Sequence, residues 1–231
     1  MKSETFYDIF KRYAVATLGL VLVAVGVACS IHSNLGTAPI SCPPYVLNLW
    51  NSSISVGQFT MLMHGIFILL QVLLLRKDFK LEHLMQIPAA ILFGLLTDTA
   101  IWAFQWIEAP TYMSKMILCL VSILVTALGI SLEVIGGAWM LAGEMTTLAI
   151  SVVIKKKFPD VKIGFDVFLT ISAAAFAWLV FGNPSGNGNE VVIREGTILQ
   201  AVLTGLAMRL TDPMAKAMFG EKRKNQGRGN P

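Results

Sequence analysis

The chain has 231 residues, of which 55% are apolar and only 14% are charged. A soluble domain of this length needs roughly 25% charged residues to cover its surface, so the composition excludes a water-soluble globular protein and predicts an all-α polytopic membrane protein. The net charge of +4 does not indicate a nucleic-acid partner, because the basic residues flank the predicted spans.

Six segments are long and apolar enough to cross the ~30 Å hydrocarbon core, which requires about 20 residues as a helix. The first is too long for a secretory signal peptide and lacks a cleavage site. In chain order the predicted spans are 13–33, 56–75, 86–107, 114–136, 163–181 and 197–219.

The distribution of basic residues predicts the orientation of these spans. All of the 18 lysines and arginines except Lys115 and Arg194 fall on one side of the six-span arrangement. Basic residues are retained in the cytoplasm, so both termini are expected there. The basic tail, 221–231, is predicted to be a disordered cytoplasmic end that can contact anionic lipid.

The two halves of the chain, 1–110 and 111–220, repeat a pattern of glycines. The matches are Leu18, Gly19 and Gly26 with Leu128, Gly129 and Gly136; Gly36 with Gly143; Gly57 with Gly164; and Gly94 with Gly205. A unit that crosses the membrane three times must be followed by an inverted copy. The pattern therefore predicts two inverted three-helix repeats, an arrangement that many transporters use to build a central site.

Two further segments, 34–55 and 137–158, are too apolar for ordinary loops, and each follows the first span of its half. Such interrupted segments indicate a transporter binding site. We expect short re-entrant helices at about 41–50 and 145–157, with their N-termini inside the membrane, where unpaired N–H groups would suit an anionic or polar group. The alternative is a pair of amphipathic helices lying flat on the two surfaces. The candidate substrate-binding residues here are Gly36, Thr37, Pro39, Ser41, Gly143, Glu144 and Thr146.

Three charged residues inside predicted spans are further candidates for the substrate site, because a charge at membrane depth is costly. Glu133 either serves function or is an interfacial residue paired with lysine, and Glu144 either binds substrate or caps its helix. Asp98 and Arg209 each follow a matched glycine by four residues. They are predicted to pair directly or through water; the alternative is that Arg209 reaches the interface while Asp98 faces an outward cavity.

No catalytic motif accompanies these residues. The chain contains no HExxH sequence, no phosphate-binding P-loop and no Cys/His cluster with metal-ligand spacing. Its three cysteines read as small buried apolar residues. An enzyme, a metal site and a cofactor are therefore not expected.

Several motifs resemble the YczE/YyaS/YitT family of bacterial integral membrane proteins. They are NLGTAPIS (34–41) with PYVL (44–47), SVG (55–57), LLRKDFK (74–80), QIPAAILFG (86–94), LEVIGGAWMLAGEMTTLAIS (132–151), VKIGFDV (161–167) and VVIREGT (191–197). The resemblance implies a bacterial inner-membrane protein and names no substrate. Relatives often carry Pro-Trp-Asp in the first re-entrant segment. Here Pro39-Ile40-Ser41 lacks that acidic residue, whereas Glu144 retains the one in the second segment.

The leading functional hypothesis is a small-molecule secondary transporter or facilitator, with proton coupling through Glu133 or Glu144 as one option. The second is a non-transporting membrane module, either a substrate-binding subunit or an accessory factor. An aquaporin-like channel is disfavoured because the chain lacks NPA motifs and its short segments follow the first and fourth spans. The expected partners are membrane lipid and a small molecule, and a homo-oligomer remains open.

Overall fold

The computed structural model describes residues 6–76, 79, 81–138, 141–156 and 158–219, and these residues form helices without a β-strand. The basic tail, predicted to be disordered, lies outside the described residues. The elements are α1 (Phe6–Ser33), η1 (Pro39–Ser41), α2 (Cys42–Trp50), α3 (Val56–Leu75), η3 (Leu81–Met85), α4 (Gln86–Ala103), α5 (Tyr112–Gly136), α6 (Ala142–Ile154), α7 (Phe158–Phe181) and α8 (Glu195–Phe219).

Five of the helices in the described residues are long and apolar enough to cross a membrane: α1, α3, α4, α5 and α7. They coincide with the first five predicted spans, although α4 ends at Ala103 rather than 107. Helix α8 has 25 residues but a lower apolar content, because it carries four charged side chains. Its role as the sixth span therefore stays a prediction.

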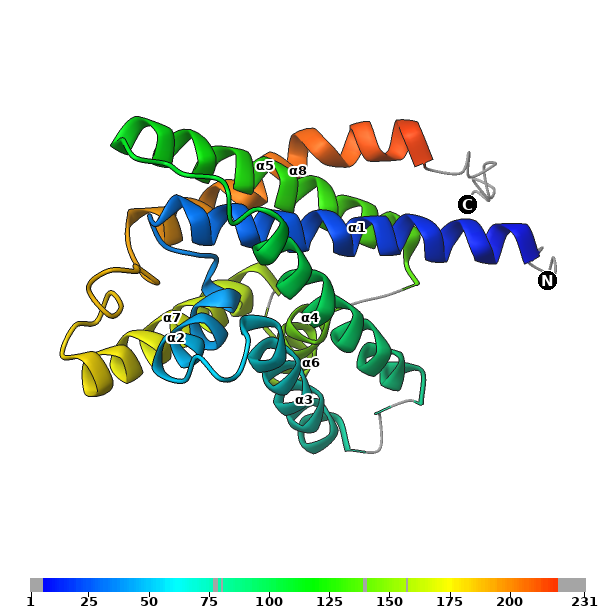
Figure 1. Ribbon diagram of the computed structural model, residues 1–231. Coiled ribbons are helices and arrows are strands. Elements are labelled where there is room, and N and C mark those ends of the chain that lie inside the picture. The colour runs from blue at the N-terminus through cyan, green and yellow to red at the C-terminus, as the bar shows by residue number, and fades with distance from the viewer. Residues whose placement is uncertain (1–5, 77–78, 80, 139–140, 157, 220–231) are drawn as a thin grey trace.

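Helices α1 and α5 form the centre of the fold and run antiparallel along much of their length (Figure 1). Their close approach depends on glycine: a Cβ atom added at Gly19 would lie 2.7 Å from the carbonyl oxygen of Gly129, and one added at Gly129 would lie 2.8 Å from that of Gly19. Small residues let helix backbones approach within van der Waals distance, which drives helix association in lipid. The start of α1 and the end of α8 lie at the same end of the molecule in Figure 1.

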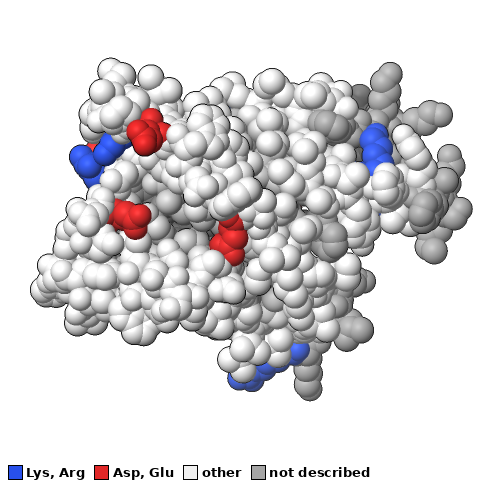
Figure 2. Space-filling view, viewed as in Figure 1, with Lys and Arg blue, Asp and Glu red and all other residues white. Residues whose placement is uncertain are grey.

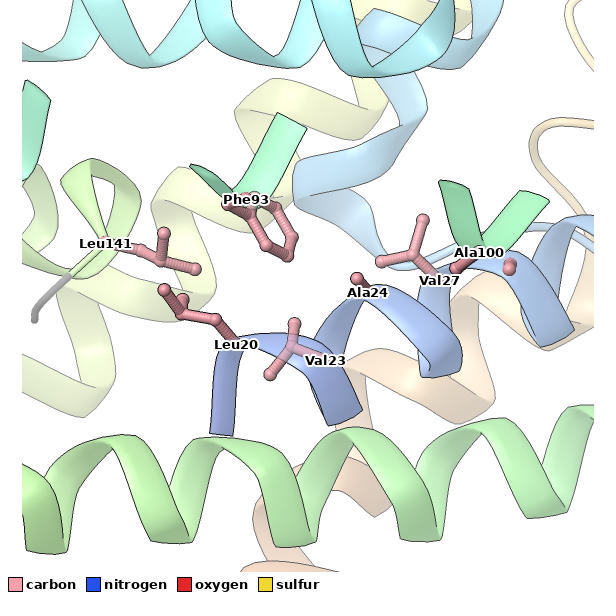
Figure 3. Close-up of a cluster of buried hydrophobic side chains, with 8 residues drawn as sticks. Leu20, Val23, Ala24, Val27, Phe93, Ala100 and Leu141 are labelled. Atoms are coloured by element: carbon pink, nitrogen blue, oxygen red, sulfur yellow. The ribbon is translucent and has the colours of Figure 1, made fainter. Parts of the chain in front are cut away.

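A buried apolar cluster joins this central pair to α4 and to the start of α6. Figure 3 shows Leu20 and Val23 of α1 facing Phe93 of α4, with Leu141 beside them. Leu141 is the N-cap residue of α6, so this cluster fixes the beginning of the short helix against the centre of the fold.

The two apolar segments predicted to be re-entrant each contain a short helix. Helix α2 has 9 residues, and α6 has 13 and begins at Ala142, three residues earlier than expected. Helix α2, in the first half of the chain, packs on α3 and α7. Helix α6, in the second half, packs on the same two helices. Their beginnings approach each other, since a Cβ atom at Gly143 would collide with the side chain of Ile40 in η1.

The outer surface of the helices is largely apolar. Exposed leucine, isoleucine, valine and tryptophan side chains occur on every long helix, as on Leu73, Trp102 and Leu179. Figure 2 shows one face on which acidic and basic side chains are few and separated by uncharged surface. Such a surface suits contact with lipid, where polar groups are costly.

Candidate functional site

A cavity of about 670 Å³ opens at the end of the molecule where α1 begins. Clefts of roughly 300–1,000 Å³ accommodate organic ligands. Four parts of the chain contribute to the lining: the first turns of α1, the η3–α4 junction, the last turns of α5 and the start of α6. The lining residues are Ile9, Arg12, Tyr13, His83, Met85, Gln86, Ile130, Glu133, Val134, Gly137, Ala138, Glu144 and Met145.

Glu133 lies one turn before the end of α5 and is only 6% exposed. Its Oε1 atom accepts a hydrogen bond of 3.0 Å from the backbone N–H of Leu141. The carboxyl therefore bridges the chain reversal between α5 and α6. This reversal begins at Gly137, a left-handed C-cap with φ 58°, a conformation that glycine adopts without steric cost.

Glu144 stands in the first turn of α6 and also lines the cavity. Its Oε2 atom is buried and has no hydrogen-bond partner among the described residues. A buried polar atom without a partner costs free energy and calls for an explanation, such as a missing ligand or water. Its carboxyl is close enough to that of Glu133 for the two to interact electrostatically.

Arg12 contributes the basic side chain at the mouth of the cavity. Its Nε atom donates to the carbonyl oxygen of Gly136 at 3.2 Å, and an Nη atom donates to that of Gly137 at 3.3 Å. A cation that binds the carbonyls at a helix C-terminus is favoured by the helix dipole. Arg12 thus holds the end of α5 against the beginning of α1.

Two glutamines form a polar clamp at the inner wall of the cavity. Gln71 of α3 and Gln86 of α4 are buried, and each amide donates to the side-chain oxygen of the other at 2.9 Å. Gln71 also donates to the Thr146 hydroxyl at 3.0 Å and to the carbonyl of Ala142 at 3.2 Å. The clamp therefore fixes the first turn of α6, where Glu144 lies.

A family model matches residues 10–213 of this chain. The chain belongs to DUF6198, a family of unknown function. The match does not name the YczE/YyaS/YitT family, so that narrower membership stays a prediction. No curated protein and no solved structure matches the chain. What the DUF6198 chain does must therefore be argued from the site itself.

Of the predicted site residues in the DUF6198 chain, the cavity includes Glu133 and Glu144, and Thr146 lies directly behind them in the glutamine clamp. The described partner of Glu133 is a backbone N–H and not a lysine. Sequence reasoning missed Gln71 and Gln86. A polar residue inside an otherwise apolar span is a usable signal for such a pair, and both positions carry it.

The other predicted residues of the first short segment lie away from this cavity. Gly36, Thr37, Pro39 and Ser41 are buried or half-buried between α1 and α2. Thr37 donates its backbone N–H to the carbonyl of Val192 at 2.9 Å. Gly36 has φ +101°, and a Cβ atom there would lie 2.7 Å from the backbone nitrogen of Arg194, so this segment is sealed against the start of α8.

The predicted pair of Asp98 and Arg209 does not form as a direct contact between these two described residues. The carboxylate of Asp98 instead accepts from the Ser55 hydroxyl at 2.5 Å and from the Gly57 backbone N–H at 2.7 Å. These donors belong to the N-terminus of α3, where negative charge is stabilised by the helix dipole. Arg209 is exposed on α8.

The start of α2 does not offer the open donors expected for an anion. In α2 the Cys42 N–H is bonded to the Ala38 carbonyl, and Pro43 and Pro44 have no N–H. At the start of α6 the carboxyl of Glu133 already accepts from Leu141. The charged groups that α5 and α6 contribute to the described lining are the carboxyls of Glu133 and Glu144.

Proposed function

We propose that the chain is a small-molecule secondary transporter or facilitator of the bacterial inner membrane, with six spans arranged as two inverted three-helix repeats. The observation that carries the proposal is the cavity of about 670 Å³ that ends at Glu133 and Glu144, beside the beginning of the short apolar helix α6. Transporter sites lie where discontinuous helices meet at the interface of two repeats. The family and the composition add no substrate to this argument.

The contacts between α1 and α5 support the repeat. Adding 110 to a residue number converts Gly19 to Gly129 and Gly26 to Gly136, and the first two of these glycines face each other. The neighbours of the other two glycines are related in the same way. Gly136 lies against Arg12 and Ala16, and Gly26 lies against Ser122 and Thr126, whose numbers are 110 higher. Contacts that survive exchange of the two halves are those expected around a pseudo-twofold axis.

The helix pairs follow the same exchange. Helix α1 packs on α4 as α5 packs on α8, and α2 packs on α7 as α6 packs on α3. If α8 crosses the membrane, every element of the first half then has a counterpart in the second.

The correspondence between the two halves fails in two places, and both differences support alternating access. The segment after α1 is bonded to the start of α8: Gly196 donates to the Leu35 carbonyl at 2.8 Å and the Gln200 amide to that of Gly36 at 3.2 Å. The corresponding segments, after α5 and before α4, line the cavity instead. With the N-terminus in the cytoplasm, the site is closed to the outside and open to the inside.

The matched glycines of the remaining helices also differ in how closely the neighbouring helix approaches them. A Cβ atom at Gly57 of α3 would clash with the carbonyl of Gly94 and with Asp98 of α4, whereas Gly164 of α7 and Gly205 of α8 have no such neighbour within 4 Å. We propose that the outward-open state reverses this difference: α7 and α8 close while α3 and α4 separate.

Uptake by purified protein in liposomes tests the proposal. A panel of amines, amino acids, vitamins and small anions should include a solute whose flux is saturable and exceeds that of protein-free liposomes. Binding of a solute without flux would favour the non-transporting module. Absence of both binding and flux across the panel would contradict the transporter.

A further inference from the structure

We infer that the cavity at Glu133 and Glu144 binds a compact organic monocation, such as a protonated amine. This inference rests on the proposed function in that the cavity is taken as the substrate site, and it goes further by naming the substrate class.

The charged side chains that line the cavity give the first reason for this inference. Among the described residues, the lining includes the carboxyls of Glu133 and Glu144 and the guanidinium of Arg12, which donates to the carbonyls of Gly136 and Gly137. Lys162 of α7 lies within electrostatic range of Glu144, but its ammonium binds Asp166 of the same helix at 2.7 Å. Among the described residues of the lining, acidic side chains therefore outnumber lysine and arginine.

The second reason is the unpartnered oxygen of Glu144, which does not depend on how many charges line the cavity. The Oε2 atom of Glu144 is buried without a partner among the described residues, while the glutamine clamp behind it holds the first turn of α6 in place. A fixed, buried carboxylate oxygen is an acceptor for a charged N–H donor, and such charge-assisted bonds are about twice as strong as neutral ones.

The size and lining of the cavity select an organic cation over a metal ion. Among the described residues no group of three or more acidic, histidine or cysteine side chains could hold a metal ion. A volume of about 670 Å³ far exceeds what a bare ion needs, and Ile9, Ile130, Val134 and Met145 give it apolar walls. Tyr13 adds an aromatic ring, whose face attracts ammonium groups.

Matched probes test this inference on the full chain purified in detergent. Butylammonium, butanamide and butanoate have similar bodies and differ in charge, and tetraethylammonium is a larger cation. Butylammonium should raise the midpoint of thermal unfolding in a saturable manner and more strongly than tetraethylammonium, which has no N–H to donate, whereas the neutral and anionic probes should not raise it. Stabilisation by butanoate alone, or by no cation, would overturn the inference.

Three variants assign the effect to the cavity. Glu144→Gln and Glu133→Gln should each weaken cation binding about tenfold or more, as expected for loss of a charge-assisted bond. Glu108→Gln removes an exposed carboxyl from the α4–α5 connection and should leave binding unchanged. Equal affinity in Glu108→Gln and Glu144→Gln would show that the cation binds elsewhere.

A measurement on the unaltered protein covers the case in which a variant fails to fold. Carbodiimide modification of Glu144, mapped by mass spectrometry, should be slowed by triethylammonium, a protonated amine that cannot form an amide with the activated carboxyl, and not by butanamide; equal rates would count against the inference. Flux separates it from the proposed function. Cation binding without flux would support the cation site and contradict the transporter. Saturable flux of an anion that is unchanged in Glu144→Gln would support the transporter and contradict the cation site.

Discussion

Gly19 is a residue at which α1 packs directly against the backbone of α5. A Cβ atom there would lie 2.7 Å from the backbone nitrogen of Glu133 and 2.7 Å from the carbonyl oxygen of Gly129. Both atoms belong to the rigid backbone of α5, so they cannot move aside as the end of a flexible side chain can. The position also connects packing to the site, because Glu133 is the buried carboxyl of the cavity.

We therefore expect Gly19→Ala to lower the free energy of unfolding by about 1–3 kcal/mol, the usual cost of overpacking, measured by denaturant titration in detergent micelles. Gly65→Ala in α3 is the matched control, since an added Cβ atom there meets nothing within 4 Å. The control should be neutral or stabilising by up to about 1 kcal/mol, from helix propensity. Equal losses in the two variants would contradict the packing argument.

Asp98 gives a second prediction at this scale, because its carboxylate binds the start of α3 rather than Arg209. Asp98→Asn should destabilise the protein by about 0.5–2 kcal/mol, as for the loss of a helix cap. In a double-mutant cycle with Arg209→Gln, the two effects should add within about 0.5 kcal/mol. A coupling energy well above this value would restore the predicted ion pair.

Helix α6 depends on packing against its neighbours, since a helix of 13 residues is only marginally stable alone. The Gln71–Gln86 pair ties its first turn to α3 and α4, and Leu141 anchors its N-cap in the core beneath α1. These contacts hold Glu144 at the cavity. They are made by residues far apart in the chain.

The glutamine pair should behave as a unit. Gln71→Leu or Gln86→Leu alone leaves a buried amide unpaired and should cost about 1–3 kcal/mol, whereas the double variant should cost less than the sum. Thermal unfolding of the four proteins measures this coupling, with the exposed Gln105→Leu as control. Additive losses would show that the two amides act independently.

Helix α8 is unusually polar for a helix that we propose to cross the membrane. Asp212 accepts a hydrogen bond of 2.6 Å from the Ser131 hydroxyl of α5, which also lies 2.8 Å from that of Thr211. A carboxylate that is bonded within the protein costs less at membrane depth than an isolated one. Such a bond would lower the cost of Asp212 if α8 crosses the membrane, as we propose.

For the whole molecule, the number of spans is the property to test. In a variant without the three native cysteines, single cysteines at the exposed positions Asn187, Lys156 and Lys216 should react with membrane-impermeant maleimide in intact cells only at Asn187. Lysis should expose the other two. Labelling of Lys216→Cys in intact cells would show that α8 does not cross the membrane and that the chain has five spans.

The sequence by itself determined the membrane class, five of the spans and the two short helices, because these depend on local apolar length and on glycine and proline positions. It also marked Gly19 and Gly129 through their repeat, and Glu133 and Glu144 through the cost of charge among apolar residues. Only the tertiary structure decided which groups meet. Asp98 binds the start of α3, Gln71 binds Gln86, and the ends of α1, α4, α5 and α6 enclose a cavity. Hydropathy and spacing describe each helix along its own axis, whereas these contacts depend on how helices distant in sequence rotate and approach one another.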